Sequence, residues 1–440
     1  NIMGTGNHAL SSAGTEAAYW SISAYNGGAT NAGYYGVGSS YAAPMVTGTA
    51  ALLKSKYPWM DGSLIRQTIL STATDIGKGG VDEDYGWGLL NIDKALKGPA
   101  LFDKRLALGD NVIVNVSPGT YTFSNDIGGD AGLIKNGVGT LKFDGNLTYT
   151  GNTVVNQGNI IINGRTYNTG LLHIKSGNVA ITKNTNIKSD VVNDNGKFTI
   201  DSNNVVLNGN YTAAKNATTT LNANSNIHIK GRVALNDSTL ELKSEKDGEI
   251  QYVTAKGTKS SIISDDKIVG NVSNVKTENM LDGKVEQTEK TLNAKLSRKN
   301  VEEYVSNLNL SDEMRNNVAE NIETSFKELD NQIENGKIKE VTAFSKNAAL
   351  IQTMSLPTTA AILDSLSGQI YASAQALTFQ QSQTVNRDLS NRLVMLGTLD
   401  NTGDNAGIWM TGIGSQGKLR QKGFGEGTTH TYGGQIGIDK

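Results

Sequence analysis

The sequence contains no cysteine and few residues of the types that most often carry chemistry. Its 440 residues include four histidines and five prolines, and only 6% are aromatic. The absence of cysteine excludes disulfide bonds and thiolate metal sites, and it suits a chain that stays unfolded while crossing an oxidising compartment. No run of about 18 apolar residues occurs, which excludes a transmembrane helix but not the weaker, alternating signal of a β-barrel.

An excess of charge of one sign is also missing. Lysine and arginine total 40 and aspartate and glutamate 42, so the formal net charge at pH 7 is −2. A chain this close to neutrality has no overall basic field to attract nucleic acid and lacks the strong acidity of a solvating tail. We therefore expect no nucleic-acid partner.

The composition and the periodicity of the sequence change three times along the chain. Residues 1–98 hold three of the four tryptophans and have a mixed α/β pattern. Residues 99–298 are rich in Asn, Thr, Gly and Lys, in short alternating runs that predict β-strands about ten residues apart. Residues 299–400 contain little glycine and have a helical period, whereas residues 401–440 return to a strand pattern. These changes predict four regions with those boundaries.

The third region predicts an amphipathic helix. Its apolar residues recur at helical spacing, and Ser311 and Gly336 are placed to begin and end the helix. The apolar stripe consists of Met314, Val318, Ile322, Phe326, Leu329 and Ile333.

A short motif in the first region predicts a serine nucleophile. The stretch "GVGSSYAAP", residues 36–44, leads directly into the helix-forming "MVTGTAALLKSKY". A serine hydroxyl attacks efficiently only when it is exposed, has a base beside it and faces amide donors for the oxyanion. Gly38 gives the backbone the freedom for a tight turn, and we expect Gly48 to allow close packing of the helix. A Gly-Ser turn that merely caps a helix is the alternative.

The order Gly-Ser-Ser-Tyr-Ala-Ala-Pro, followed by Thr-Gly, resembles the serine-nucleophile motif G-T-S-x-A-x-P of the subtilase family. This resemblance implies that Ser40 is the nucleophile of a subtilisin-like serine endopeptidase, which works through an acyl-enzyme and needs no cofactor for its chemistry. Ser39 takes the place of the usual threonine. Residues 62–77 predict a second helix, and the later "DYGWGLLNIDKAL" resembles the closing segment of subtilases of autotransporter type.

A subtilase also needs an aspartate, a histidine base and an oxyanion asparagine, and in family order all three precede the serine. His8 is the only histidine before Ser40, but "GNHALSS" lacks the His-Gly-Thr signature, so we expect a loop histidine. Asn26 and Asn31 lie closer to the serine than the family's asparagine does, and neither is assigned. We expect the missing groups to precede residue 1 and this chain alone to be inactive.

Asp82, Glu83 and Asp84 form an acidic cluster whose oxygens are ligands of the kind that Ca²⁺ prefers. A solvated turn is the other interpretation. A structural calcium ion therefore stays open, and no residue is assigned as a metal ligand.

Residues 132–164, "GLIKNGVGTLKFDGNLTYTGNTVVNQGNIIING", resemble the autotransporter-associated strand repeat. In that repeat, a Gly-Thr-Leu strand, a turn that ends in glycine and a Gly-x-Ile strand form one coil, which is stable only in a stack. The resemblance implies a right-handed parallel β-helix over residues 99–298.

Residues 356–393, "LPTTAAILDSLSGQIYASAQALTFQQSQTVNRDLSNRL", closely resemble the segment before the translocator of autotransporters. A helix that is polar almost all round suits the watery lumen of a barrel, although an ordinary solvated helix is the alternative. The strands around Ile408-Trp409-Met410 and "YGGQIGIDK" resemble the first two of the autotransporter β-barrel.

Together these resemblances imply a subtilase-type serine protease autotransporter, and we expect the sequence to be a piece of it, truncated at both ends. Its parts would be the end of an α/β protease domain, a β-helical stalk, a helical linker and the start of an outer-membrane β-barrel. The implied partners are protein or peptide substrates and the outer membrane of a Gram-negative cell, with the passenger at the cell surface or secreted. The alternative is a non-enzymatic adhesin with a degenerate protease domain.

Overall fold

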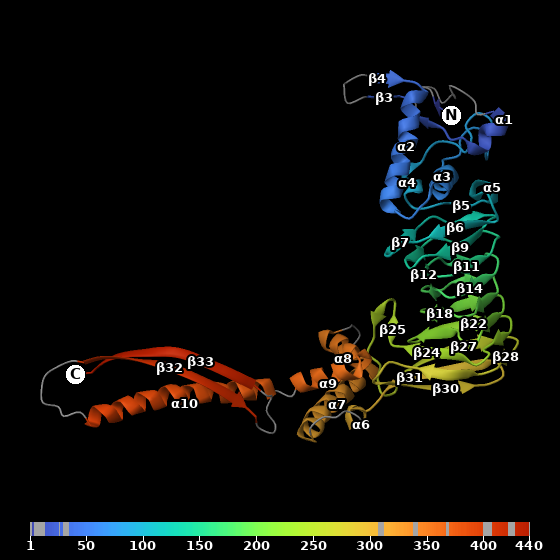
Figure 1. The fold of residues 1–440 in the computed structure, drawn as a ribbon. Coiled ribbons are helices and arrows are strands. Elements are labelled where there is room, and N and C mark those ends of the chain that lie inside the picture. Colours follow the sequence, from blue (N-terminus) through green and yellow to red (C-terminus); the bar gives the residue numbers. More distant parts are fainter. Residues whose placement is uncertain are drawn as a thin grey trace. The chain divides into compact units, whose positions relative to one another are not determined.

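The structure is a computed structural model with two compact units, Asn1–Ser297 and Arg298–Lys440 (Figure 1). It describes residues 2–3, 14–25, 27–29, 35–306, 312–337, 342–366, 369–398, 407–420 and 427–439.

The first unit begins with a small α/β segment, which confirms the mixed pattern predicted for this part of the sequence. Its helices are α1 (Gly14–Ala17), the 3₁₀ helix η1 (Ala18–Trp20), α2 (Ser39–Lys56), α3 (Gly62–Ser71) and α4 (Ile92–Ala95). Its strands are β1 (Ile2–Met3), β2 (Ala24–Tyr25), β3 (Gly27–Ala29) and β4 (Tyr35–Val37). β1 and β2 pair in parallel, and β3 and β4 pair antiparallel.

Local chemistry explains where α3 begins and which side it buries. The Asp61 side chain caps the helix by accepting a hydrogen bond from the backbone N–H of Leu64 at 2.8 Å. Leu64, Ile69 and Leu70 are buried, and all three are at positions that the helical period had placed on one side. The predicted second helix is confirmed.

Most of the first unit is a parallel β-solenoid, coloured from cyan to yellow in Figure 1. One sheet of 8 strands contains β7 (Thr120–Phe123), β10 (Thr140–Phe143), β12 (Asn159–Ile162), β15 (Asn178–Ile181), β18 (Lys197–Ile200), β21 (Thr218–Asn222), β24 (Ser238–Lys243) and β29 (Val272–Lys276). A second contains β6 (Asn111–Asn115), β9 (Gly132–Asn136), β11 (Thr153–Val155), β14 (Leu172–Ile174), β17 (Val191–Asn193), β20 (Tyr211–Ala213), β23 (Val233–Ala234) and β28 (Ile268–Val269).

The third sheet has 7 strands: β13 (Thr166–Tyr167), β16 (Asn186–Ile187), β19 (Val205–Leu207), β22 (Asn226–Ile229), β27 (Thr258–Ser264), β31 (Thr291–Arg298) and β30 (Leu281–Gln287). Its strands are parallel from β13 to β27, but β27 and β31 are antiparallel. The antiparallel pair ends the regular stack of coils. Shorter elements nearby are β5 (Leu101–Phe102), α5 (Lys104–Ala107), β8 (Gly128–Gly129), β25 (Glu245–Lys246) and β26 (Glu249–Ile250).

One coil of the solenoid is about 20 residues long. Leu133 pairs with Thr153, Thr153 with Leu172 and Leu172 with Val191, each one coil further on. The parallel stack predicted from the sequence is confirmed, but residues 132–164 hold more than one coil, because β9 to β12 all lie within them. The Gly-Thr-Leu and Gly-x-Ile strands that were expected in one coil are β10 and β12, which pair with each other on successive coils. Alternation along a strand cannot show which later strand pairs with it.

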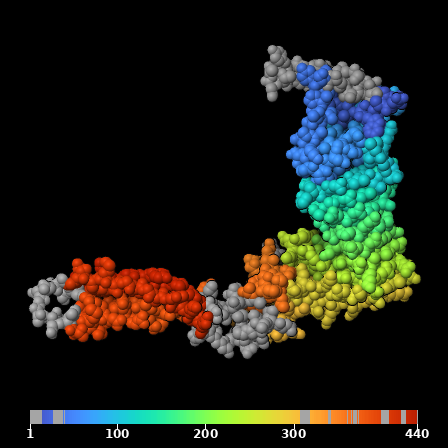
Figure 2. All heavy atoms as spheres, viewed as in Figure 1, coloured from blue at the N-terminus to red at the C-terminus, as the bar shows by residue number. Residues whose placement is uncertain are grey.

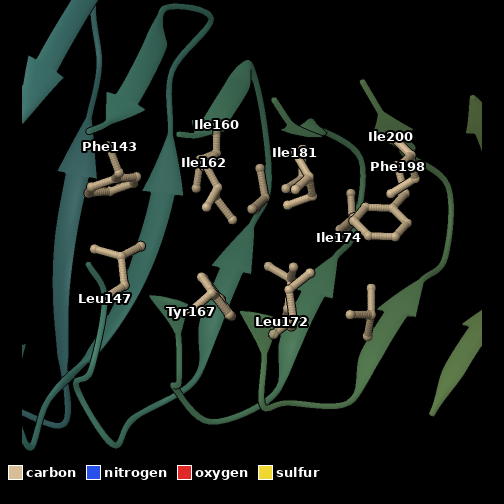
Figure 3. Packing of buried hydrophobic residues seen from close by; sticks show 14 of the residues in the cluster. Phe143, Leu147, Ile160, Ile162, Tyr167, Leu172, Ile174, Ile181, Phe198 and Ile200 are labelled. Atoms are coloured by element: carbon tan, nitrogen blue, oxygen red, sulfur yellow. The ribbon is translucent and has the colours of Figure 1, made fainter. Parts of the chain in front are cut away.

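Inward-facing side chains stack in rows along the solenoid (Figure 3). Ile162, Ile181 and Ile200 are direct partners on successive strands, and each has 0% of its surface exposed. Burial of such a side chain stabilises the fold by roughly 1.5–3 kcal/mol relative to an exposed one. The core is therefore a continuous hydrophobic column, to which each coil adds one layer.

The corners of the coils explain why this part of the chain is rich in glycine and asparagine. A Cβ on Gly164 would lie 2.1 Å from the carbonyl oxygen of Gly145 in the preceding coil, so only glycine fits there. Asn178 Nδ2 donates to Asn159 Oδ1 at 2.7 Å, and Asn159 Nδ2 donates to Thr140 Oγ1 at 3.0 Å. Asparagine thus bonds coil to coil through side chains as well as backbone.

A single lysine interrupts the hydrophobic column. Lys135 of β9 is fully buried, and its Nζ donates to the carbonyl oxygens of Asn136, Gly137 and Gln157 at 3.1, 2.7 and 2.9 Å. Burial lowers the pKa of Lys135 to about 8. The side chain thereby closes a corner whose carbonyl groups point into the core.

The α/β segment covers the first coil of the solenoid. The Tyr57 hydroxyl donates to the carbonyl oxygens of Leu96 and Thr122, both at 2.9 Å, and its ring centroid lies 5.4 Å from that of Phe123. Asn125 Nδ2 donates to the carbonyl oxygen of Lys94 at 2.8 Å. One hydrophobic cluster runs through both parts. In Figure 2 the blue segment and the cyan coils accordingly form a continuous body.

The second unit contains helices followed by a long hairpin. Its elements are α6 (Val301–Ser306), α7 (Asp312–Glu334), α8 (Ala343–Thr353), α9 (Leu356–Leu366), α10 (Gln369–Thr398), β32 (Gly407–Leu419) and β33 (Gly427–Asp439). No helix among the residues that the structure describes is long and apolar enough to cross a membrane.

α7 confirms the predicted amphipathic helix. Val318, Phe326 and Leu329 are buried, and Gly336 follows the helix with a φ of +67°, a conformation that favours glycine. Ser311 and the side chain of Met314 lie outside what the structure describes.

A buried ion network fixes α7 to the start of the second unit. Arg298 donates through Nη1 and Nη2 to the two carboxylate oxygens of Glu323, at 2.9 and 3.1 Å, and through Nε to Asp330 at 2.9 Å. Glu323 also accepts the backbone N–H of Val301 at 2.9 Å. Because removal of one partner would leave a buried charge uncompensated, this network holds the helix in one register.

The two faces of the β32–β33 hairpin differ in character, and the predicted C-terminal antiparallel strands are confirmed. On the face towards α10, the Arg392 guanidinium lies 5.6 Å from the Trp409 ring centroid, and a Cβ on Gly417 would meet Gln380 Oε1 at 2.9 Å. Other apolar side chains of the hairpin are exposed: Ile408, Met410, Tyr432, Ile436 and Ile438.

We expect Gly164→Ala to destabilise the solenoid by roughly 1–3 kcal/mol, because the new methyl group would overlap the preceding coil. Gly109→Ala is the matched control, since a Cβ there has no described atom within 4 Å, and its effect should stay within about 0.5 kcal/mol. Chemical denaturation followed by circular dichroism measures both effects. Equal midpoints for the two variants would contradict the close contact.

We expect Lys135 to make stability depend on pH. Its pKa is about 8 in the folded chain and its ordinary value is 10.5, so between these values the unfolded chain binds more protons. The contribution of Lys135 to the free energy of unfolding should therefore rise with pH in that window. Denaturation of the wild type and Lys135→Met at about pH 8 and about pH 10 measures this, and a constant difference between them would refute it.

Candidate active site

Ser40 lies at the start of α2, at a sharp change of backbone direction. β4 ends at Val37, and Gly38 connects it to the helix with a φ of +151°, a value that favours glycine. The carbonyl oxygen of Gly38 accepts the N–H of Tyr41 at 3.0 Å, which closes the first turn. The side chain of Ser40, the second residue of the helix, is exposed.

Small residues after Ser40 let the helix lie against β2. Ala42 and Ala24 are 4% and 2% exposed and form a small cluster. Met45, Val46 and Leu90 pack around them. The alanines of the motif thus set how closely α2 approaches the strand, while Ser40 points away from that contact into solvent.

The position of Ser40 suits the formation of negative charge. The N–H groups in the first turn of a helix have no intrahelical acceptor, and the helix dipole favours an anion there. α2 is 18 residues long, so its N-terminus carries the full effect. An oxyanion formed beside Ser40 would be stabilised electrostatically.

None of the elements that hold Ser40 bears a histidine among the described residues. His173 lies on β14 and its Nε2 donates to a carboxylate oxygen of Asp194 at 2.6 Å, His228 lies on β22 beside Asp265, and His430 lies on β33. No described side chain forms a hydrogen bond with the Ser40 hydroxyl. His8, Asn26, Asn31 and the side chain of Ser39 lie outside what the structure describes.

Two further expectations about this segment can be compared with the geometry. A Cβ on Gly48 would have no described atom within 4 Å, apart from its own helix, so the expectation of close packing there is wrong for the described residues. Asp82 Oδ1 accepts the backbone N–H groups of Asp84 and Tyr85 at 2.8 and 2.7 Å. Glu83 accepts the Thr15 hydroxyl at 3.0 Å.

The acidic residues Asp82 to Asp84 therefore make contacts of a hydrogen-bonded turn. Among the described residues, no group of three or more histidine, aspartate or glutamate side chains is arranged to hold a metal ion.

The motif, the helix and the turn that follows it are shared with known proteins. Residues 3–88 match the profile described as "Subtilase family". This stretch, which contains Ser40 and the closing turn, is therefore similar to that family. Ser40 lies within the matched residues, and its role as the nucleophile stays a prediction.

Parts of the chain are similar to proteins named as autotransporters and as proteases. The chain is 49% identical over 127 residues to the autotransporter lipoprotein NalP of Neisseria meningitidis, a match that covers 29% of this chain and 12% of that protein. It is 38% identical over 175 residues to an extracellular serine protease of Serratia marcescens, a match that covers 32% of this chain and 17% of that protein.

A third relative is the serotype-specific antigen 1 of Mannheimia haemolytica, 30% identical over 204 residues, which covers 46% of this chain and 19% of that protein. The chain thus spans less than a fifth of the length of each of these three relatives.

The closing turn of the subtilase segment has a role that the sequence alone did not reveal. Trp87 Nε1 donates to the carbonyl oxygen of Tyr19 at 2.8 Å, and the Tyr19 hydroxyl bonds to Asp103 at the start of the solenoid. The Arg105 guanidinium lies 4.1 Å from the Tyr19 ring centroid. The pKa of Tyr19 is raised, mainly by burial of the hydroxyl and to a smaller extent by the bond to Asp103. These residues tie the subtilase segment to the first coil.

Gly38, which precedes α2, and Gly48, inside it, should respond in opposite directions to alanine. Gly38→Ala forces an L-residue into a φ of +151° and should destabilise the segment by roughly 1–3 kcal/mol. Gly48→Ala adds a methyl group in open space inside a helix and should stabilise it by roughly 0.5–1 kcal/mol. Chemical denaturation of the two variants measures these effects. If both changes have the same sign, the turn at Gly38 is not as described.

Proposed function

We propose that the whole protein is a serine endopeptidase that is exported by its own C-terminal strands, with Ser40 as its nucleophile. The observation that carries the proposal is the exposed Ser40 hydroxyl in the first turn of α2, directly after a glycine of positive φ, inside a subtilase segment. The names of the Serratia and Neisseria relatives support both the protease activity and the mode of export.

In the proposed reaction, Ser40 Oγ attacks the carbonyl carbon of the scissile peptide bond and passes its proton to a histidine base. Collapse of the tetrahedral intermediate expels the amine, which takes that proton, and leaves an acyl-enzyme that water then hydrolyses. The described residues supply the nucleophile and the helix N-terminus. We propose that the histidine, the aspartate and the oxyanion asparagine lie before residue 1, so that the 440-residue chain alone is inactive.

The remaining parts of the chain support the proposed location. The exposed apolar face of β32 and β33 fits strands that face lipid, and the polar α10 packs on their other face, as a helix in a barrel lumen would. We therefore propose that these strands begin an outer-membrane barrel of a Gram-negative cell. The solenoid would then present the subtilase segment at the cell surface, with or without later release, to protein or peptide substrates.

A non-enzymatic adhesin is the competing function. The observation that favours it is that none of the described elements around Ser40 contains a base that could activate the hydroxyl. A degenerate protease segment would then serve only to cover the end of a solenoid that binds cells.

Replacement of Ser40 separates these functions. In the whole protein, Ser40→Ala should abolish peptide hydrolysis and labelling by a fluorophosphonate probe, and in subtilisin loss of the triad serine lowers kcat by about 2 × 10⁶-fold. Ser39→Ala is the matched control and should have a far milder effect. Surface display should survive both changes, because the solenoid and the C-terminal strands do not depend on either hydroxyl.

The 440-residue chain itself should show no hydrolysis or labelling above background. Labelling that persists in Ser40→Ala and disappears in Ser39→Ala would overturn the assignment of the nucleophile. A whole protein that cleaves no member of a peptide library would favour the adhesin.

A further inference from the structure

Three lysines gather on the outer face of the sheet that ends the solenoid. β31 lies between β27 and β30, and Lys259 of β27 is the direct cross-strand partner of Lys295 of β31. Lys284 of β30 lines the same surface hollow, which has a volume of about 600 Å³. All three side chains are exposed. We refer to Lys259, Lys284 and Lys295 as the lysine cluster.

The lysine cluster is not neutralised within the described part of the chain. No ion pair joins any of its three ammonium groups to a described carboxylate, although Glu286 lines the same hollow. Other lysines of the solenoid have carboxylates at 2.7 to 3.5 Å, namely Lys142, Lys197, Lys230 and Lys243. Like charges directly opposite each other destabilise a sheet, so this arrangement costs stability unless an anion compensates it.

Apart from Glu286 and Ala294, the rest of the hollow is lined by neutral polar groups. Ser261 and Asn293 are cross-strand partners next to the Lys259–Lys295 pair, and Asn226 lies beside Ser261 on β22. The hollow therefore combines three positive charges and one negative charge with amide and hydroxyl groups. This lining suits an anion with several oxygen acceptors rather than an apolar ligand.

We propose that the lysine cluster binds the phosphate headgroups of an anionic lipid surface. The ammonium group of lysine is a compact charge that binds phosphate well, and an antiparallel sheet holds its outward side chains in one layer that can meet a flat surface. The net charge of the whole chain is −2, so any such attraction is local to the cluster.

The position of the cluster in the chain favours a lipid over a soluble phosphate. β30 and β31 are the last strands of the solenoid, and the second unit, which ends in the strands proposed to meet the membrane, follows directly. The choice of a membrane as partner thus rests on the proposed location, but not on the chemistry of Ser40. Binding would add an electrostatic contact between the solenoid and the membrane.

Vesicle flotation of the full 440-residue chain tests the proposal. The vesicles contain either phosphatidylcholine alone or phosphatidylcholine with phosphatidylglycerol. The cluster variant carries Lys259→Gln, Lys284→Gln and Lys295→Gln. The control variant loses the same charge at exposed lysines elsewhere on the solenoid, through Lys175→Gln, Lys188→Gln and Lys215→Gln. Circular dichroism checks that both remain folded.

We expect the cluster variant to bind phosphatidylglycerol vesicles at least about tenfold more weakly than the wild type and the control, with binding that weakens as salt is raised. Phosphatidylcholine vesicles should bind all three proteins equally, because they report the exposed apolar residues of the hairpin. Equal binding of the cluster variant and the control to phosphatidylglycerol vesicles would overturn the proposal.

Tripolyphosphate provides the second arm of the experiment. Binding of tripolyphosphate by the wild type, without any preference for phosphatidylglycerol vesicles, would replace the lipid by a soluble phosphate and overturn the assignment. Ser40→Ala should leave vesicle binding unchanged. A failure of the proposed protease function and a failure of lipid binding are therefore read from separate measurements.

Discussion

The pairing of each solenoid coil with the next is the interaction on which the first unit depends. A coil of about 20 residues exposes its aliphatic edge until a neighbour covers it, and the rows that contain Ile162, Ile181 and Ile200 show this cover repeated along the stack. The same contact completes the backbone hydrogen bonds of both coils. The cover of the aliphatic edge and the backbone hydrogen bonds both require the coils to lie close together. Residues such as Gly164 and Asn178 therefore occupy the corners.

A stack of coils has two open ends, and the chain covers them in different ways. At the first coil, the subtilase segment supplies Tyr57, whose ring packs on Phe123 and whose hydroxyl meets two carbonyl groups. At the last coils, β31 pairs antiparallel with β27 and ends the parallel register. One core runs from the subtilase segment into the solenoid. The solenoid therefore helps to hold α2, and with it Ser40, in place.

The site itself is small compared with the structure that carries it. Gly38 turns the chain, Ala42 seats α2 on β2, and Ser40 projects from the first turn of the helix. These contacts present a hydroxyl where a helix N-terminus favours negative charge, but they do not activate it. Activation requires a base, and the described histidines, such as His173, lie on other elements. The turn, α2 and β2 therefore hold the Ser40 hydroxyl in position, but its reactivity depends on a base that these elements do not supply.

The sequence by itself determined the features whose causes are local: the Gly38–Ser40 turn, the short alternating strands and the amphipathic α7. Only the tertiary structure decided the length of a coil, the burial of Lys135, and the pairing of Arg298 with Glu323. It also showed that Gly48 packs against no other described element. The physical reason is the same in each case. Local preference depends on neighbouring residues, which the sequence displays, whereas pairing, burial and the loss of solvent depend on residues that only the fold brings together.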